Sequence, residues 1–164
     1  MKSVGLSLVI VGALVSFVQA YFTGRMVKRF GERIVIFAGF LLWTIGMVAI
    51  GMATTSVFLY IAILPYLFGG IAGPTIQGLV SNHVSDREQG NLQGVMTSLG
   101  SLSAVIAPVI YTRLFYHYTD GTTALYLPGA PFLFGAGVLV LGTITVIYAL
   151  KNIKKQPEHE ADEF

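Results

Sequence analysis

Apolar residues occur in five long runs along the chain, at 4–22, 34–53, 57–80, 91–115 and 128–150, and short polar links separate them. The hydrocarbon core of a bilayer is about 30 Å thick and a helix rises about 1.5 Å per residue, so a membrane span needs about 20 apolar residues. Each run is long enough. The pattern therefore predicts an all-α membrane protein with five transmembrane helices.

Composition supports a membrane environment and removes several functional classes. Hydrophobic residues make up 54% of the chain and charged residues 11%, whereas about 25% of an ordinary soluble domain is charged. The formal net charge of +2 is too small to indicate a nucleic-acid partner. Cys is absent, which excludes disulfides and thiolate metal sites. We expect the lipid bilayer to be the solvent of most of the surface.

The basic residues predict the orientation of the spans. Four lie in the link 24–33, and three lie between 151 and 155. The positive-inside rule assigns both regions to the cytoplasmic side of the membrane. Five alternating spans then place the N-terminus outside and the C-terminus in the cytoplasm, as in a multi-pass protein of the cell inner membrane. Residues 1–152 would form the transmembrane domain, and the polar, acidic residues 153–164 a disordered cytoplasmic tail.

The N-terminus allows a second interpretation. Lys2, the apolar run that follows and the small residues around Val18-Gln19-Ala20 resemble a signal peptide with a cleavage site. The run is long for a signal peptide, however, and cleavage would leave four basic residues on the outer side. A retained first span is the simpler interpretation.

Caps and prolines indicate local features of the helices. Ser85 and Glu88 have the spacing of a capping box, in which the hydroxyl and the carboxylate each accept a backbone N–H. A proline within a helix removes one hydrogen bond and bends the helix. We therefore expect bends in two spans, at Pro65 and Pro74 in 57–80 and at Pro108 in 91–115. Pro128 and Pro131 should lie in the first turn of the span 128–150, where a missing N–H costs little.

Three of the runs carry a stripe of small and polar residues. Lipid is as apolar as leucine, so such stripes mark faces that meet other helices or a polar cavity. The stripes are Gly5, Gly12, Ser16, Gln19 and Thr23; Ala62, Tyr66, Gly70, Gly73 and Gln77; and Gly90, Gly94, Thr97, Ser101, Ala104, Pro108 and Tyr111. The runs 34–53 and 128–150 have no comparable stripe, which predicts that they face lipid.

Four side chains in these stripes are candidates for a substrate cavity: Gln19, Tyr66, Gln77 and Thr97. An unpaired amide in hydrocarbon costs a few kcal/mol, so Gln19 must meet another helix, water or a substrate. Ordinary helix packing is the competing interpretation for each position. The five runs contain neither Asp nor Glu, and the chain has no catalytic or metal-binding motif. We expect no enzyme activity, no cofactor and no metal site.

The link 24–33, with the sequence GRMVKRFGER, resembles the second copy of the major facilitator superfamily signature, G-x-x-x-D-R-x-G-x-R. Gly24, Arg29, Gly31 and Arg33 fit the pattern, and Lys28 stands where the signature has Asp. The resemblance implies that Arg25, Arg29 and Arg33 act at a cytoplasmic gate. The alternative is that these arginines serve only as topology anchors.

The segments 69–78, 85–94 and 99–108 are similar to helices ten and eleven of the tetracycline-resistance-like drug:proton antiporters. The likeness covers nearly the whole chain and implies helices eight to twelve of the C-terminal six-helix bundle, without its first helix. Two departures stand out. Val15 and Trp43 occupy the positions where tetracycline exchangers carry an intramembrane His and Asp.

The resemblance implies part of a secondary active, proton-coupled efflux transporter for tetracycline-like or multidrug amphiphilic solutes. Its partners would be a small-molecule solute, protons, the lipid bilayer and an N-terminal transporter half, in the same gene or a separate chain, that supplies the coupling acids. No nucleic acid is implied. Two alternatives stay open: a truncated or split-gene membrane module without autonomous transport, and a major facilitator carrier of another solute class.

Overall fold

The computed structural model describes residues 2–121 and 126–152, and within this range it leaves undescribed the side chains of residues 2–8, 10, 11, 18, 86 and 150–152. The expected disordered tail, 153–164, lies outside the described residues. The described part of the chain is helical. Its helices are α1 (Lys2–Phe30), α2 (Glu32–Gly51), α3 (Ser56–Gly69), α4 (Ala72–Ser81), α5 (Asp86–Thr119) and α6 (Ala130–Asn152).

α1 does not end where the apolar run ends but continues through the basic link to Phe30. Its last turn contains Lys28 and Arg29, which suit the negative end of the helix dipole, and Glu32 opens α2, where the dipole is positive. Gly31 alone joins the two helices. Its φ of 81° and ψ of 154° form a conformation that is essentially restricted to glycine. The link is thus a sharp helical corner rather than an extended loop.

The run 57–80 forms two helices instead of one. α3 ends at Gly69 and α4 begins at Ala72, with a turn at Gly70 and Ile71 between them. Pro74 explains the position of the break, because it has no N–H for the Gly70 carbonyl and its ring collides with that carbonyl. Helix geometry runs without interruption through Pro65 and Pro108.

α5 is longer than the apolar run 91–115 at both ends. Its cap is at Ser85, as expected, but the capping box differs from the expected form. The Ser85 hydroxyl donates to a Glu88 carboxylate oxygen at 2.7 Å, and it makes no bond to a backbone N–H. The Ser85 carbonyl instead accepts the N–H groups of Glu88 and Gln89. In α6 only Pro131 lies in the first turn, because Pro128 precedes the helix.

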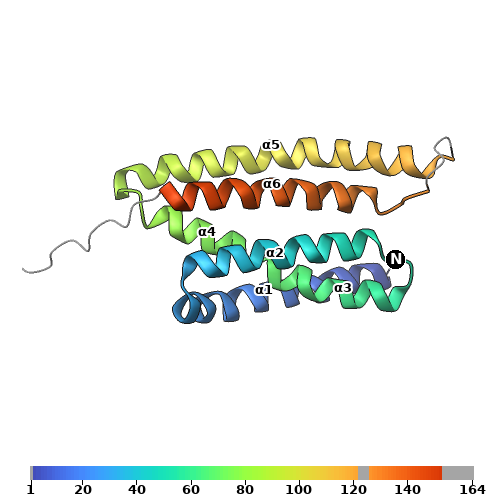
Figure 1. Cartoon of the computed structure of the whole chain (residues 1–164), viewed down its shortest axis with the longest axis horizontal. Helices are drawn as coiled ribbons and strands as arrows, with labels where there is room; N and C mark the ends of the chain where they lie inside the picture. Colours follow the sequence, from blue (N-terminus) through green and yellow to red (C-terminus); the bar gives the residue numbers. More distant parts are fainter. Residues whose placement is uncertain (1, 122–125, 153–164) are drawn as a thin grey trace, which may run out of the picture.

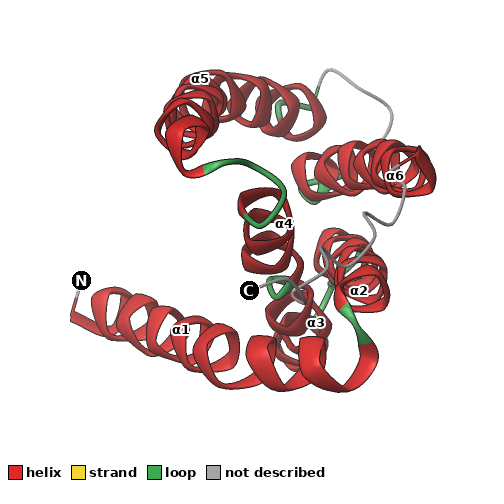
Figure 2. Ribbon diagram, turned by 90° about the vertical axis from the view of Figure 1, so that its left-hand side faces the viewer, coloured by secondary structure: helices red, strands yellow, loops and turns green. Residues whose placement is uncertain are grey.

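α2 lies at the centre of the helix packing. Figure 1 shows it between α6 and the pair α1 and α3, and Figure 2 shows α3 and α4 on one side of it and α6 on the other. α5 packs mainly on α6, and the N-terminal end of α1 lies apart from the other helices. The expectation that the run 34–53 faces lipid is therefore wrong for the side of α2 that packs on α3, α4 and α6. Val35 and Ile36 are buried, whereas Phe37 and Leu41 are exposed.

Large apolar side chains cover the outside of the molecule. Leu99, Val105 and Leu141 are 60%, 70% and 65% exposed, and no described residue of α5 is buried. Exposure on this scale is a property of surfaces that meet lipid or further helices. Among the fully described residues, four segments are long and apolar enough to span a bilayer: Glu32–Gly51, Ser56–Ser81, Arg87–Thr119 and Ala130–Ala149. The fifth expected span, 4–22, lies within α1, where many side chains are undescribed.

Candidate functional site

The break between α3 and α4 is the least regular backbone within a membrane span. The N–H of Gly70 bonds to the Leu67 carbonyl at 3.2 Å, and the N–H of Ile71 bonds to the Phe68 carbonyl at 3.3 Å. Both bonds reach back three residues instead of four, as in a tight 3₁₀ turn. Irregular backbone is tolerated at membrane depth only where protein or a cavity satisfies it. The groups that lie against the break therefore show whether protein side chains cover it.

Gln19 lies against this break. A Cβ atom built on Gly70 would be 3.2 Å from Gln19 Nε2, so the amide of α1 occupies the space that the missing side chain leaves. The neighbouring Phe22 holds α1 in place through an edge-to-face contact with Phe68, at 5.7 Å between ring centroids. Gln19 is half-buried. The Gln19 amide thus lies against the backbone turn where α3 ends.

Two further polar atoms near the break have no partner among the described residues. They are Thr23 Oγ1, one turn after Gln19 on α1, and Trp43 Nε1 on α2. Trp43 borders the break directly, because a Cβ atom built on Gly69 would lie 2.5 Å from the Trp43 Cα. A buried donor without a hydrogen bond costs about 1–3 kcal/mol. A water or a ligand group would stabilise both atoms.

The other predicted cavity residues are not gathered here. Tyr66 packs against α2: its ring meets Trp43 edge to face at 6.1 Å, and its backbone N would be 2.6 Å from a Cβ atom on Gly46. The predicted stripe aligned Tyr66 and Gln77 on one face of a continuous helix, but the break between α3 and α4 separates the two residues. Gln77 is exposed on α4, and Thr97 is exposed on α5.

The basic signature forms the corner between α1 and α2. Arg25 donates from Nη1 to the Tyr21 carbonyl at 3.1 Å, and its guanidinium carbon lies 3.8 Å from the centre of the Tyr21 ring. The guanidinium carbon of Arg29 lies 5.5 Å from the centre of the Phe30 ring. Arg33 and Gly24 are exposed. Gly31 makes the turn, whereas a Cβ atom on Gly24 would meet nothing within 4 Å.

Sequence reasoning missed a glycine seam along α2. A Cβ atom on Gly39 would be 2.8 Å from the Ala72 Cβ, and Gly46 and Gly69 make the approaches described above. Small residues allow helix backbones to approach this closely in membranes. The signal was available, because Gly39 and Gly46 are seven residues apart and Trp43 lies between them. The large apolar residues of the same run obscured it.

Several hydroxyl groups of the spans bond within their own helix. Thr44, Thr75 and Thr143 donate to carbonyls four residues back, at 2.7–2.8 Å. Such bonds satisfy a hydroxyl in an apolar environment without a partner helix. The described acidic side chains of α2 and α5, Glu32 and Glu88, lie in first turns at helix ends. No cluster of metal-ligating side chains occurs among the described residues.

Long apolar helices, a span interrupted at paired glycines and exposed apolar faces define a polytopic α-helical membrane protein. Its family follows from comparison with known sequences. The chain belongs to the Major Facilitator Superfamily, whose family model matches residues 2–163.

Several curated relatives are named as tetracycline resistance proteins. The tetracycline resistance protein of class C from Escherichia coli is 37% identical over 112 residues, which cover 68% of this chain and 28% of the relative. The class E protein from Escherichia coli is 33% identical over 141 residues, covering 86% of this chain and 34% of that protein. Hippocampus abundant transcript-like protein 1 from Rattus norvegicus is 21% identical over 152 residues, covering 84% and 30%.

This chain spans about a third of the length of the curated relatives that it matches. No solved structure matches it. The family and the helical membrane fold are thus established, as is the resemblance to tetracycline resistance proteins.

Proposed function

We propose that this chain is part of a secondary active efflux transporter for tetracycline-like or other amphiphilic solutes, coupled to protons. Membership of the Major Facilitator Superfamily and the names of the relatives support transport and this solute class. The observation that carries the proposal is the break at Gly70 with the Gln19 amide against it. Interrupted membrane helices are where secondary transporters bind solutes and coupling ions.

Gln19, Thr23 and Trp43 would supply the polar contacts. All three carry hydrogen-bond donors in a largely apolar region, and amphiphilic drugs combine flat apolar surface with several acceptors. Gln77 and Thr97 are proposed as cavity residues on the remaining faces, since both are exposed. Tyr66 would act indirectly, because its ring contacts Trp43 and would hold that side chain in position.

Proton coupling would depend on residues outside these helices. The described acidic side chains of α2 and α5 lie at helix ends, whereas proton carriers are ionisable groups inside the membrane. Alternating access also requires two bundles that rock about one site. We propose that an N-terminal transporter half supplies the acids and the opposite cavity wall, and that the corner with Arg25, Arg29 and Arg33 lies at the cytoplasmic gate.

Transport measurements with and without a second half test the proposal. The purified chain in proteoliposomes should not accumulate tetracycline under an imposed proton gradient. The same chain assembled with the N-terminal half of a tetracycline resistance protein should do so. Accumulation by the chain alone would contradict the need for two halves. Failure of the assembled pair with tetracycline, but success with another amphiphile, would support the alternative of a different solute class.

A Gln19→Leu substitution tests the site itself. It keeps the size of the side chain and removes the amide, so loss of one hydrogen bond of about 1 kcal/mol should lower the apparent solute affinity about fivefold. Thr145→Val is the control, because Thr145 is exposed on α6 and its hydroxyl bonds to the Leu141 carbonyl of the same helix. Equal effects of the two substitutions would remove Gln19 from the proposed site.

A further inference from the structure

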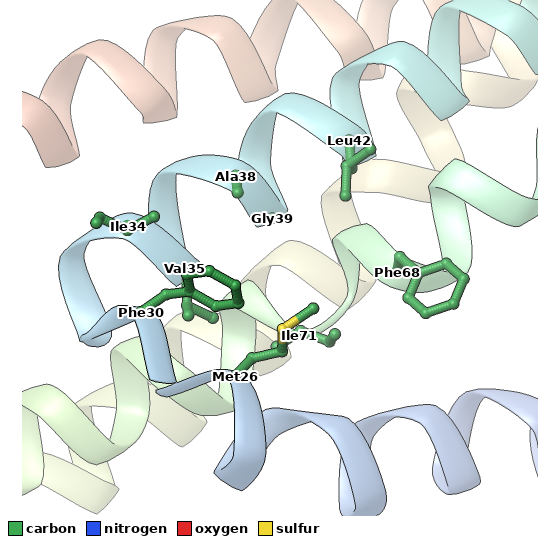
Figure 3. A pocket seen from close by; sticks show the side chains of 9 residues that line it. All are labelled: Met26, Phe30, Ile34, Val35, Ala38, Gly39, Leu42, Phe68 and Ile71. Atoms are coloured by element: carbon green, nitrogen blue, oxygen red, sulfur yellow. The ribbon is translucent and has the colours of Figure 1, made fainter. Parts of the chain in front are cut away.

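An apolar groove of about 220 Å³ opens beside the corner between α1 and α2. Figure 3 shows its walls: Met26 and Phe30 from α1, Ile34 and Leu42 from α2, and Ile71 at the break. The groove is not sealed, because Phe30 and Ile34 are 46% and 60% exposed. Gly39 of the glycine seam and Ile71 of the break belong to its wall, but none of Gln19, Thr23, Trp43, Gln77 and Thr97 does.

The length of the groove matches one leaflet of a membrane. Its wall on α2 runs from Ile34 through Ala38 to Leu42, three residues that share one face at spacings of four. Eight residues of helix correspond to about 12 Å, and half of a hydrocarbon core is about 15 Å thick. An extended acyl chain would therefore lie along α2 from the corner toward the middle of the bilayer.

Positive charge gathers at the mouth of the groove. The guanidinium carbon of Arg29 lies 5.5 Å from the centre of the Phe30 ring, and Phe30 is itself part of the wall. Lys28 is exposed one residue before Arg29, at the same end of α1. An occupant that complements both regions has an apolar chain and an anionic head. A zwitterionic lipid would bring its own ammonium group to this positive corner, and a free phosphate would leave the groove empty.

We propose that this groove is a binding site for an anionic phospholipid of the leaflet that the basic corner faces. One acyl chain lies between Phe30, Ala38 and Leu42, and the headgroup phosphate is held by Arg29, which adjoins the Phe30 ring. Basic pockets between membrane helices recognise anionic headgroups by the same combination of charge and apolar contact. The site is independent of the proposed transport activity.

Trp43 allows a direct measurement, because it is the single tryptophan of the chain and follows Leu42 in α2. The full chain would be reconstituted in phosphatidylcholine membranes that contain brominated phosphatidylglycerol, and the quenching of Trp43 fluorescence would be measured. The same measurement with brominated phosphatidylcholine gives the comparison. We expect phosphatidylglycerol to bind about tenfold more tightly. Soluble glycerol phosphate should not compete, which distinguishes a lipid headgroup from a free phosphate.

Two pairs of substitutions test the head and the chain separately. Arg29→Gln should lower the preference for phosphatidylglycerol about fivefold, whereas Arg113→Gln, an exposed arginine of α5, should leave it unchanged. Ala38→Phe should fill the groove and reduce quenching by both lipids, whereas Ala149→Phe on α6 should not. An unchanged Trp43 emission spectrum without brominated lipid shows that each variant keeps its fold.

Three results would overturn the proposal. The first is equal binding of the two lipids, and the second is an Arg113→Gln effect as large as that of Arg29→Gln. The third is loss of the phosphatidylglycerol preference when an N-terminal transporter half is assembled with the chain, since a protein segment would then occupy the groove.

Discussion

The contact between Gly69 and Trp43 gives the most direct test of how the bundle is packed. A Cβ atom added at Gly69 would lie 2.5 Å from the N, Cα and Cβ atoms of Trp43. These are backbone and Cβ atoms, so no flexible side chain can yield. Gly73, one turn later in α4, has nothing within 4 Å of its Cβ position. Gly69→Ala and Gly73→Ala thus make the same chemical change in opposite environments.

The expected magnitude follows from the geometry. Carbon atoms pack best at about 3.5–4.0 Å, so Gly69→Ala must separate α2 and α3 by about 1 Å, which forfeits a quarter to a half of the dispersion energy of the atoms involved. Overpacking of this kind costs about 1–3 kcal/mol. Gly73→Ala should instead stabilise its helix by about 0.5–1 kcal/mol. The two variants should differ by about 2–4 kcal/mol in the free energy of unfolding.

Thermal unfolding of the full chain in detergent, followed by Trp43 fluorescence, measures this difference. At about 2–4 °C per kcal/mol for a chain of this size, Gly69→Ala should unfold about 4–16 °C below Gly73→Ala. The emission maximum should also change only in Gly69→Ala, because only that side chain touches Trp43. Equal unfolding temperatures and equal spectra would refute the reasoning, since the helices would then not approach as closely as described.

Three further predictions follow from the backbone. Gly31→Ala should destabilise the chain by about 1–3 kcal/mol because its φ of 81° strains any other residue. Gly24→Ala, in open space, should be neutral or slightly stabilising. The opposite order of unfolding temperatures would contradict the described turn at Gly31. Pro74→Ala should restore a donor for the Gly70 carbonyl and join α3 to α4, seen as slower hydrogen exchange of the amides at 70–75; unchanged exchange would mean that Pro74 does not cause the break. Reporter enzymes active only outside the cytoplasm should be active when fused before residue 1 and inactive when fused after residue 164; the reverse result would contradict the proposed orientation.

The sequence by itself determined the fold class and the family. Runs of about 20 apolar residues allow little except membrane helices, because each unpaired backbone group in lipid costs several kcal/mol. The signature at 24–33 identified the superfamily that the comparisons confirm. Both signals are local: one needs only composition within a run, and the other only the order of ten neighbouring residues.

The tertiary structure decided which residues meet. Pro74 predicted a disturbance in its span, but only the structure located the break at Gly70 and brought Gln19 of α1 against it. Tyr66, before the break, contacts Trp43 of α2, whereas Gln77 lies after the break on α4. A stripe predicted from one ideal, continuous helix does not account for a break within that helix. Lipid contact, helix packing and cavity lining all accept apolar and small residues, so only the positions of neighbouring helices distinguish them.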